Sequence, residues 1–134
     1  DAAVRTRQLR ELLAWAEGEY QRGQHVVIGG DWNFQLAETN FPNNTDQRFL
    51  FWLFPFPQDA LPEGWRIAAD ATIPSVRTNH QAYVPGENYT TTIDGFIVSP
   101  NVSVERVSGL DLGFEHSDHQ PVRLTVRAIR GGSE

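Results

Sequence analysis

The sequence predicts an α+β fold, in which helices pack on a mixed, mainly antiparallel β-sheet to form an α/β sandwich. Two observations lead to this prediction. An amphipathic helical segment is followed directly by a short apolar strand, an order typical of layered α/β structure. Several further strand segments come after it, and Pro and Gly residues that favour turns separate them.

The composition is that of a folded domain. The 134 residues are 40% hydrophobic and 21% charged, which is enough to bury a core. No apolar run reaches the roughly 20 residues of a membrane span. The absence of Cys excludes disulfides and thiolate metal sites. Because Met is also absent, we expect Asp1 to be an internal or processed end.

The net charge of −6 argues against broad, unspecific binding to nucleic acid, which depends on Lys and Arg neutralising phosphates. All eleven basic residues are Arg. An acidic site that binds a divalent cation is compatible with this balance.

The first segment predicts an amphipathic helix that ends near Gly23. Its apolar residues recur at spacings of three and four and form one stripe, which consists of Leu9, Leu12, Leu13, Ala16 and Tyr20. Residues 25–30 have the sequence HVVIGG. This consecutive apolar run predicts a buried strand that is covered on both faces.

Later strands are predicted at residues 65–69, 75–78, 90–99, 102–107 and 122–129. The last of them alternates well, with Val122, Leu124, Val126 and Ala128 on one face. The tail, residues 131–134, is expected to fray.

Residues 49–57, FLFWLFPFP, are dense in aromatic side chains. We expect Thr45 to cap a short helix over residues 46–54, and we interpret the aromatic segment as a buried helix that packs under the sheet. Two alternatives stay open: a surface loop for a hydrophobic or lipid substrate, and a surface that faces an absent part of the fold.

Residues 30–33, GDWN, place polar side chains directly after the first predicted strand. At that position Asp31 is available to bind a metal or to orient an attacking water, and Asn33 can donate a hydrogen bond to a phosphate oxygen. The alternative is a turn in which both side chains bond their own backbone.

Residues 93–98, IDGFIV, place Asp94 inside an otherwise apolar strand. Burying an unpaired carboxylate costs several kcal/mol, so Asp94 should have a partner, and a histidine is the natural one. The alternative is a structural Asp that accepts hydrogen bonds from backbone amides.

Residues 117–121, SDHQP, directly precede the final strand. Asp118 offers a hard oxygen ligand that suits Mg²⁺ or a similar cation, and His119 can contact a phosphate or assist proton transfer. If Asp94 accepts a hydrogen bond from His119, it fixes the tautomer and favours the charged imidazolium. The alternative is ordinary loop material.

Taken in this order, the motifs GDWN, IDGFIVS and SDHQPV resemble the endonuclease/exonuclease/phosphatase superfamily, which has the deoxyribonuclease I-like fold. The resemblance implies a metal-dependent phosphoester hydrolase, a phosphodiesterase, nuclease or phosphatase. It implies that Asp31 and Asn33 position the water and hold the phosphate. It also implies that Asp94 pairs with His119, and that His119 contacts the scissile phosphate.

The same resemblance places Asp118 in the metal site and implies Mg²⁺ or Mn²⁺ as the cofactor. Residues 74–78 match the family only loosely, and there Arg77 is a candidate for substrate binding. The substrate class stays open between nucleic acid, a phospholipid and a small phosphate ester.

The resemblance also implies that the chain is the C-terminal half of a four-layer sandwich. In the family, a glutamate metal ligand and a second histidine lie upstream of the GDxN motif, whereas only one helix precedes Asp31 here. We therefore expect residues 1–134 to be a partial domain whose partner is the missing N-terminal half, and the fragment alone to be inactive. A catalytically silent binding or scaffold domain on the same fold is the alternative.

Overall fold

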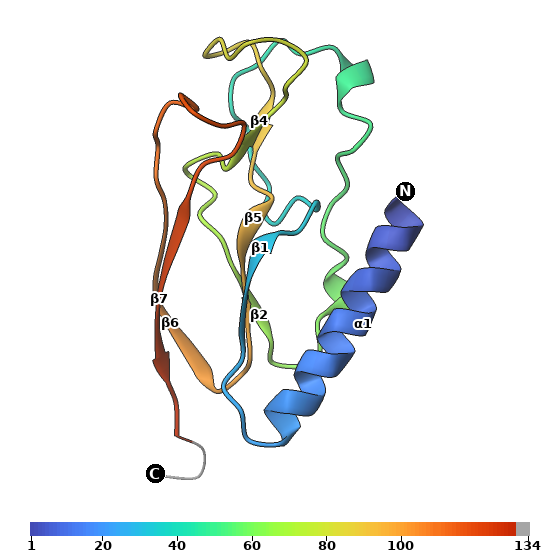
Figure 1. Ribbon diagram of the computed structural model, residues 1–134, viewed down its shortest axis with the longest axis vertical. Coiled ribbons are helices and arrows are strands. Elements are labelled where there is room, and N and C mark those ends of the chain that lie inside the picture. The colour runs from blue at the N-terminus through green and yellow to red at the C-terminus, as the bar shows by residue number, and fades with distance from the viewer. Residues whose placement is uncertain (131–134) are drawn as a thin grey trace.

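A computed structural model describes residues 1–130 of the chain, with one long helix, a small antiparallel sheet and a two-stranded ribbon (Figure 1). The helix runs along one side of the sheet, and the ribbon lies on the other side. The fold is therefore α+β, as predicted. The predicted tail, residues 131–134, lies outside the described residues.

Helix α1 (Ala2–Gln21) is the predicted amphipathic helix. The side chain of Asp1 caps its start by accepting a hydrogen bond from the backbone N–H of Ala3 at 2.9 Å. The helix ends at Arg22, and Gly23 follows with a φ of +91°, a left-handed conformation that glycine adopts without a steric penalty. The predicted end of the helix near Gly23 is confirmed.

The strands pair in three groups, and every named pair is antiparallel. The three-stranded sheet has the order β1–β5–β2. Its strands are β1 (Val27–Asp31), β5 (Asp94–Val98) and β2 (Arg66–Ala68). The other two groups are β3 (Val76–Arg77) with β4 (Thr90–Thr91), and β6 (Val102–Gly109) with β7 (Val122–Ala128).

These strands confirm the predicted strand positions, with one difference. The predicted strand over residues 90–99 is divided into β4 and β5, and Thr92 and Ile93 lie between them. Among the described residues, the parallel character expected of a mixed sheet is limited to one isolated bridge, between Gln35 and Pro55.

The prediction that β1 is buried on both faces is wrong. Most of its residues are exposed, and the side chain of Val27 is 42% exposed. The reason lies in the topology, because β1 is an edge strand that pairs only with β5 among the described residues. In addition, Gly29 and Gly30 carry no side chain that could contribute to a core.

The prediction of a buried aromatic helix is also wrong. Only residues Gln47–Phe49 form a short 3₁₀ helix, η1. Its cap is Asp46, whose side chain accepts from the N–H of Arg48 at 2.9 Å. Thr45 instead donates its hydroxyl hydrogen to the carbonyl of Glu87 at 2.8 Å.

The aromatic segment splits between the core and the surface. Phe56 is 4% exposed, whereas Phe51 is 79% exposed. Pro55 and Pro57 interrupt the segment, and proline cannot continue a helix. A second short 3₁₀ helix, η2, follows at Gln58–Ala60.

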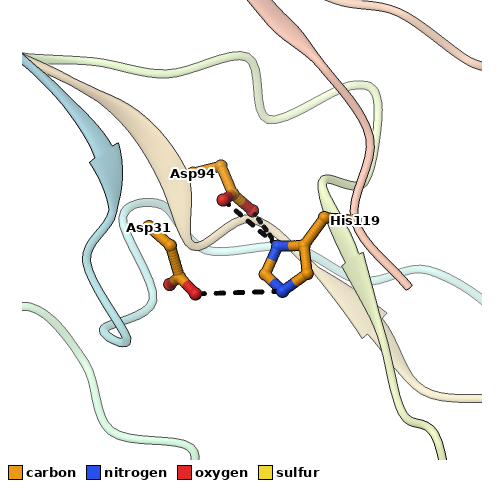
Figure 2. Close-up of side chains that lie close together, drawn as sticks. All are labelled: Asp31, Asp94 and His119. Atoms are coloured by element: carbon orange, nitrogen blue, oxygen red, sulfur yellow. Dashed lines mark hydrogen bonds and ion pairs between the residues drawn. The ribbon is translucent and has the colours of Figure 1, made fainter. Parts of the chain in front are cut away.

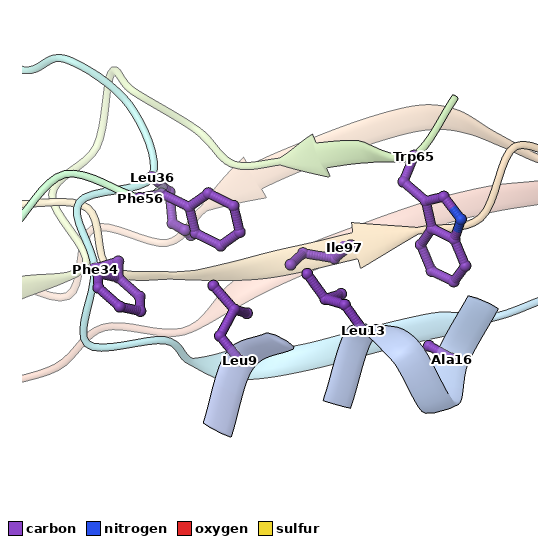
Figure 3. Close-up of a cluster of buried hydrophobic side chains, with 8 residues drawn as sticks. All are labelled: Leu9, Leu13, Ala16, Phe34, Leu36, Phe56, Trp65 and Ile97. Atoms are coloured by element: carbon purple, nitrogen blue, oxygen red, sulfur yellow. The ribbon is translucent and has the colours of Figure 1, made fainter. Parts of the chain in front are cut away.

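The main core fills the space between α1 and the sheet (Figure 3). The helix contributes one row of side chains, and β5 and the connecting segments contribute the rest. The cluster consists of Leu9, Leu13, Ala16, Phe34, Leu36, Phe56, Trp65 and Ile97. Within it, Phe34 and Phe56 pack edge to face with ring centroids 5.9 Å apart. This core gives the adjoining ends of β1 and β5 a rigid base.

The β6–β7 ribbon is less well covered than its alternating sequence predicts. Val122 and Leu124 are half-buried, but Val126 is 39% exposed and Ala128 is exposed. Asp70 ties the ribbon to the rest of the fold by accepting from the N–H of Gly109 at 2.9 Å. Among residues 1–130, no helix combines the length and the apolar content needed to cross a bilayer.

Candidate active site

The antiparallel register brings the first two motifs together. Asp31, the last residue of β1, lies opposite Asp94, the first residue of β5. The third motif reaches the same place from the other end of the chain, because His119 forms an isolated bridge with Val76 of β3. Figure 2 shows the imidazole ring of His119 beside both carboxylates. Side chains from three distant parts of the sequence therefore meet at one point.

The hydrogen bond between Asp94 and His119 is the best-defined contact of the site. His119 Nδ1 lies 2.9 Å from Asp94 Oδ2 and 3.2 Å from Asp94 Oδ1. An ionised carboxylate can only accept, so Nδ1–H donates and Nε2 is left facing Asp31. This hydrogen bond raises the pKa of His119, and burial of the ring acts in the opposite direction. The charge of Asp31 raises the same pKa further.

Asp94 is held in place by a serine that the sequence analysis did not single out. The buried hydroxyl oxygen of Ser75 accepts from the backbone N–H groups of Ile93 and Asp94, each at 3.0 Å. These bonds fix the backbone where β5 begins. Ser75 gives no sequence signal for this role, because its distance in the chain from Asp94 conceals the contact.

Asp31 occupies the more open side of the site. Its Oδ2 atom lies 3.8 Å from His119 Nε2, and its Oδ1 atom accepts from the N–H of Asn33 at 2.9 Å. Burial is the main cause that raises the pKa of Asp31, and the nearby negative charge of Asp94 adds to it. The hydrogen bond from Asn33 acts in the opposite direction. The ionised form of Asp31 therefore has a higher affinity for a proton or a cation than an ordinary surface carboxylate.

Asn33 forms the turn that was its alternative interpretation, and it also lines the site. Its φ is +54°, in the left-handed region that Asn tolerates better than most residues. The turn does not remove it from the cavity, since Asn33 is among the lining residues. The structure therefore confirms the turn at the GDWN motif and leaves the side chains of Asp31 and Asn33 on the cavity wall.

Arg5 is a residue of the site region that the sequence analysis missed. Its guanidinium donates to the carbonyl of Asn33 at 2.5 Å and to that of Trp52 at 3.1 Å. It thereby connects α1 to the turn after β1 and to the aromatic segment. A lone Arg on a helix gives no signal of such a role, because most surface arginines contact only water.

Asp118 and Arg77 lie side by side on two adjoining backbone segments. The N–H of Arg77 donates to the carbonyl of Asp118 at 2.9 Å, and the N–H of Gln120 donates to the carbonyl of Ser75 at 2.8 Å. Asn79 Nδ2 donates to Asp118 Oδ2 at 3.4 Å. Both predicted residues line the cavity that contains Asp31 and His119.

A cavity of about 250 Å³ joins all the predicted site residues except Asp94. It is lined by Asp31, Asn33, Phe49, Phe51, Trp52, Val76, Arg77, Thr78, Asn79, His80, Ile93, Asp118 and His119. Asp94 stands behind His119 and contacts it through Nδ1. The cavity has a polar part around His119 and an aromatic part formed by residues 49–52 and His80.

Two polar atoms of this region are buried without a hydrogen-bond partner among the described residues. They are the Nε atom of Arg77 and the hydroxyl oxygen of Thr78, a residue that is only 4% exposed. Leaving a buried polar group unsatisfied costs about 1–3 kcal/mol. Both residues line the cavity, but these two atoms are themselves shielded from solvent.

The donor set of the site suits a hard divalent cation. One ligand atom each of Asp31, Asp94 and His119 lies within 4.8 Å of the others. Carboxylate oxygens are the ligands that Mg²⁺ and Mn²⁺ prefer. Asp118, the predicted metal ligand, lies outside this trio, but its charge acts on both Asp31 and His119.

Comparison with known proteins gives one match. The model of the Endonuclease/Exonuclease/phosphatase family matches residues 1–119, so the chain belongs to this family, as the motifs predict. Members of the family are in general metal-dependent phosphoester hydrolases. No curated protein and no solved structure matches the chain significantly.

Proposed function

We propose that this member of the endonuclease/exonuclease/phosphatase family is, in the intact protein, a divalent-metal-dependent hydrolase that cleaves a phosphoester by in-line attack of water. The observation that carries the proposal is the position of His119, whose Nδ1 atom lies 2.9 Å from Asp94 and whose Nε2 atom lies 3.8 Å from Asp31. A histidine held between two carboxylates at the edge of a cavity is arranged to bind an anion and to handle a proton.

Asp94 and His119 act together on the phosphate. Asp94 orients the imidazole ring and, through the same hydrogen bond, keeps it protonated to a higher pH than an ordinary histidine. The Nε2–H group then donates to a phosphate oxygen, and the imidazolium stabilises the negative charge that develops on it.

Asp31 and Asn33 act on the attacking water and on the phosphate. Asp31 accepts a hydrogen bond from the water, and its raised pKa makes it a better proton acceptor than a fully solvated carboxylate. The amide of Asn33 donates to a phosphate oxygen. Because Asp31 and Asn33 lie in one tight turn, the water and the phosphate are held at a fixed separation.

Asp118 would help to hold Mg²⁺ or Mn²⁺ on the cavity wall. When bound, such a cation acts as a Lewis acid that neutralises charge on the phosphoryl oxygens. Asp118 also accepts a hydrogen bond from Asn79, which limits the orientations of its carboxylate.

Arg77 is the candidate for a second cationic contact with the substrate. It lines the same cavity as His119, and a guanidinium can bind a phosphate oxygen there.

The site is open on the side of β1, and this supports the expectation of a partial domain. Among the described residues, the outer edge of β1 pairs with no strand, and the side chain of Asp31 is 38% exposed. An unpaired edge strand is a template for further strands. The N-terminal half of the same domain would pair along this edge, complete the metal site and exclude water, and the fragment alone would be inactive.

The proposal is tested by the variant Asp31→Asn in the intact protein, with hydrolysis of bis(p-nitrophenyl) phosphate in the presence of Mg²⁺ as the assay. Loss of the carboxylate should lower kcat by about 100-fold or more. The matched control is Asp59→Asn, which removes a carboxylate whose side chain is 78% exposed in an ion pair with Arg10. Full activity of Asp31→Asn would overturn the assignment and favour a silent binding or scaffold domain.

A further inference from the structure

The aromatic part of the cavity has no role in the chemistry at the phosphate. Phe49, Phe51 and Trp52 line the same cavity as Asp31 and His119. The proposed mechanism uses Asp31 and His119 but none of the three aromatic rings. These rings, called the aromatic wall below, are therefore available to contact another part of the substrate.

Phe49, Trp52 and His80 are held in place before any ligand binds. The rings of Phe49 and His80 are stacked, with centroids 4.3 Å apart and an angle of 9° between their planes. The guanidinium of Arg48 lies 4.8 Å from the centroid of Phe49. Trp52 is fixed by its indole N–H, which donates to the carbonyl of Phe49 at 2.9 Å. A preorganised wall loses little conformational entropy when a ligand packs on it.

Phe51 differs from its neighbours in having a ring that is free to accept a ligand. Its side chain is 79% exposed, although it borders the cavity. A single exposed apolar residue is ordinary on a protein surface. Phe51, however, lies beside two further aromatic side chains and within the same cavity as the phosphate-binding groups, so one ligand can reach both.

We propose that the substrate is a phosphoester that carries a flat aromatic ring, and that Phe51 determines this specificity by packing against the ring while the phosphate lies at His119. The inference rests on the proposed function, since the phosphate must first bind at that position. Aromatic rings attract one another through offset-stacked or edge-to-face contacts beyond the effect of buried area. The stacked pair of Phe49 and His80 shows that flat rings pack face to face at this place.

The size of the cavity supports a ring rather than a long chain. Its volume of about 250 Å³ is below the usual range of roughly 300–1,000 Å³ for pockets that hold drug-sized ligands. A phosphate group and one ring occupy such a space.

The test compares three ligands by NMR titration of the intact protein with Mg²⁺ present: inorganic phosphate, phenyl phosphate and cyclohexyl phosphate. The last two have similar apolar bulk, but only phenyl phosphate is flat. The wild type should bind phenyl phosphate about 2- to 10-fold more tightly than cyclohexyl phosphate. In Phe51→Ala and Phe51→Leu this preference should disappear while the affinity for inorganic phosphate stays the same.

The matched control is Phe54→Ala. Phe54 belongs to the same segment and is 37% exposed, but it does not line the cavity. This variant should keep the preference for phenyl phosphate. Equal binding of the two esters by the wild type, or a preference that survives in Phe51→Ala, would overturn the inference and leave the phosphate site intact. Failure of all three ligands to bind would overturn the proposed function together with it.

Discussion

Replacing Asp94 by Asn changes the charge of the partner of His119 and little else. The Asn side chain keeps a carbonyl oxygen that can accept from Nδ1–H, but it no longer stabilises a protonated ring. The hydrogen bond to Asp94 is the largest cause of the raised pKa of His119, so the pKa should fall in Asp94→Asn. Two-dimensional ¹H–¹⁵N spectra of the imidazole, recorded across a pH series, measure this change directly.

The same variant should also lower stability in a pH-dependent way. A hydrogen bond to a charged group contributes about 1.5–3 kcal/mol, and the 33% exposure of the His119 side chain reduces this through solvent screening. We therefore expect a loss of roughly 1–2 kcal/mol, which corresponds to a fall in Tm of about 3–8 °C for a domain of this size.

The sign follows from the direction of the pKa shift. The pKa of His119 is raised above its ordinary value of 6.5, so the stabilisation is fully present below that pH and is lost as the pH rises through the folded-state pKa. Urea denaturation should show a larger difference between Asp94→Asn and wild type at about pH 6 than at about pH 9. Equal differences at both pH values, with an unchanged His119 titration, would refute the assigned pairing. Asp59→Asn is again the control.

Three further predictions concern stability. Burial raises the pKa of Asp31 above 3.8, so the ionised carboxylate destabilises the folded state increasingly as the pH rises through that pKa. The variant Asp31→Asn should therefore leave the free energy of unfolding at about pH 7 unchanged or higher. A clear loss of stability in urea denaturation would contradict this. Gly95→Ala should destabilise by about 1–3 kcal/mol because its Cβ would lie 2.8 Å from the carbonyl oxygen of Ala68, whereas Gly30→Ala on the paired strand meets nothing within 4 Å and should unfold like the wild type. Hydrogen bonds, chiefly from the hydroxyl of Thr72, lower the pKa of Asp70, so the stabilisation they give is present above pH 3.8 and is lost as the pH falls through the folded-state pKa. The variant Asp70→Asn should therefore lower the free energy of unfolding by about 1 kcal/mol at neutral pH. A loss of the same size in strong acid would argue against this assignment.

The pairing of Asp94 with His119 could be predicted from sequence because it follows from a strong energetic constraint. A carboxylate inside an apolar strand needs a partner, and few residue types can provide one. Asp31 was predictable for a different reason, since a polar residue at the end of an apolar run is placed at the edge of a sheet. The C-terminal end of the helix was predictable because Gly23 is a local signal.

Other features depend on contacts that the local pattern does not contain. The apolar run of β1 is the same whether the strand is central or at an edge, so its exposure could not be foreseen. The roles of Ser75 and Arg5 arise from contacts with distant parts of the chain. The aromatic segment was assigned by composition alone, and its prolines, which were visible in the sequence, should have been given more weight than its hydrophobicity.

The chain illustrates how a small sheet can position a site at its edge. The core between α1 and the sheet is rigid and apolar, while the polar side chains cluster where β1 ends and β5 begins. His119 reaches this point because its backbone pairs with Val76. Packing therefore determines the geometry of the site, and the site residues themselves contribute little to the core.

The central claim is that Asp31, Asp118 and His119 surround one site for a cation and a phosphate. It is tested most directly by anomalous diffraction from crystals of the intact protein soaked with Mn²⁺ and phosphate. We predict an anomalous peak at the carboxylate of Asp118, in the cavity that Asp31 also lines, with a phosphate oxygen hydrogen-bonded to Nε2 of His119. A fully occupied cation site elsewhere, with this cavity holding neither ion, would contradict the account.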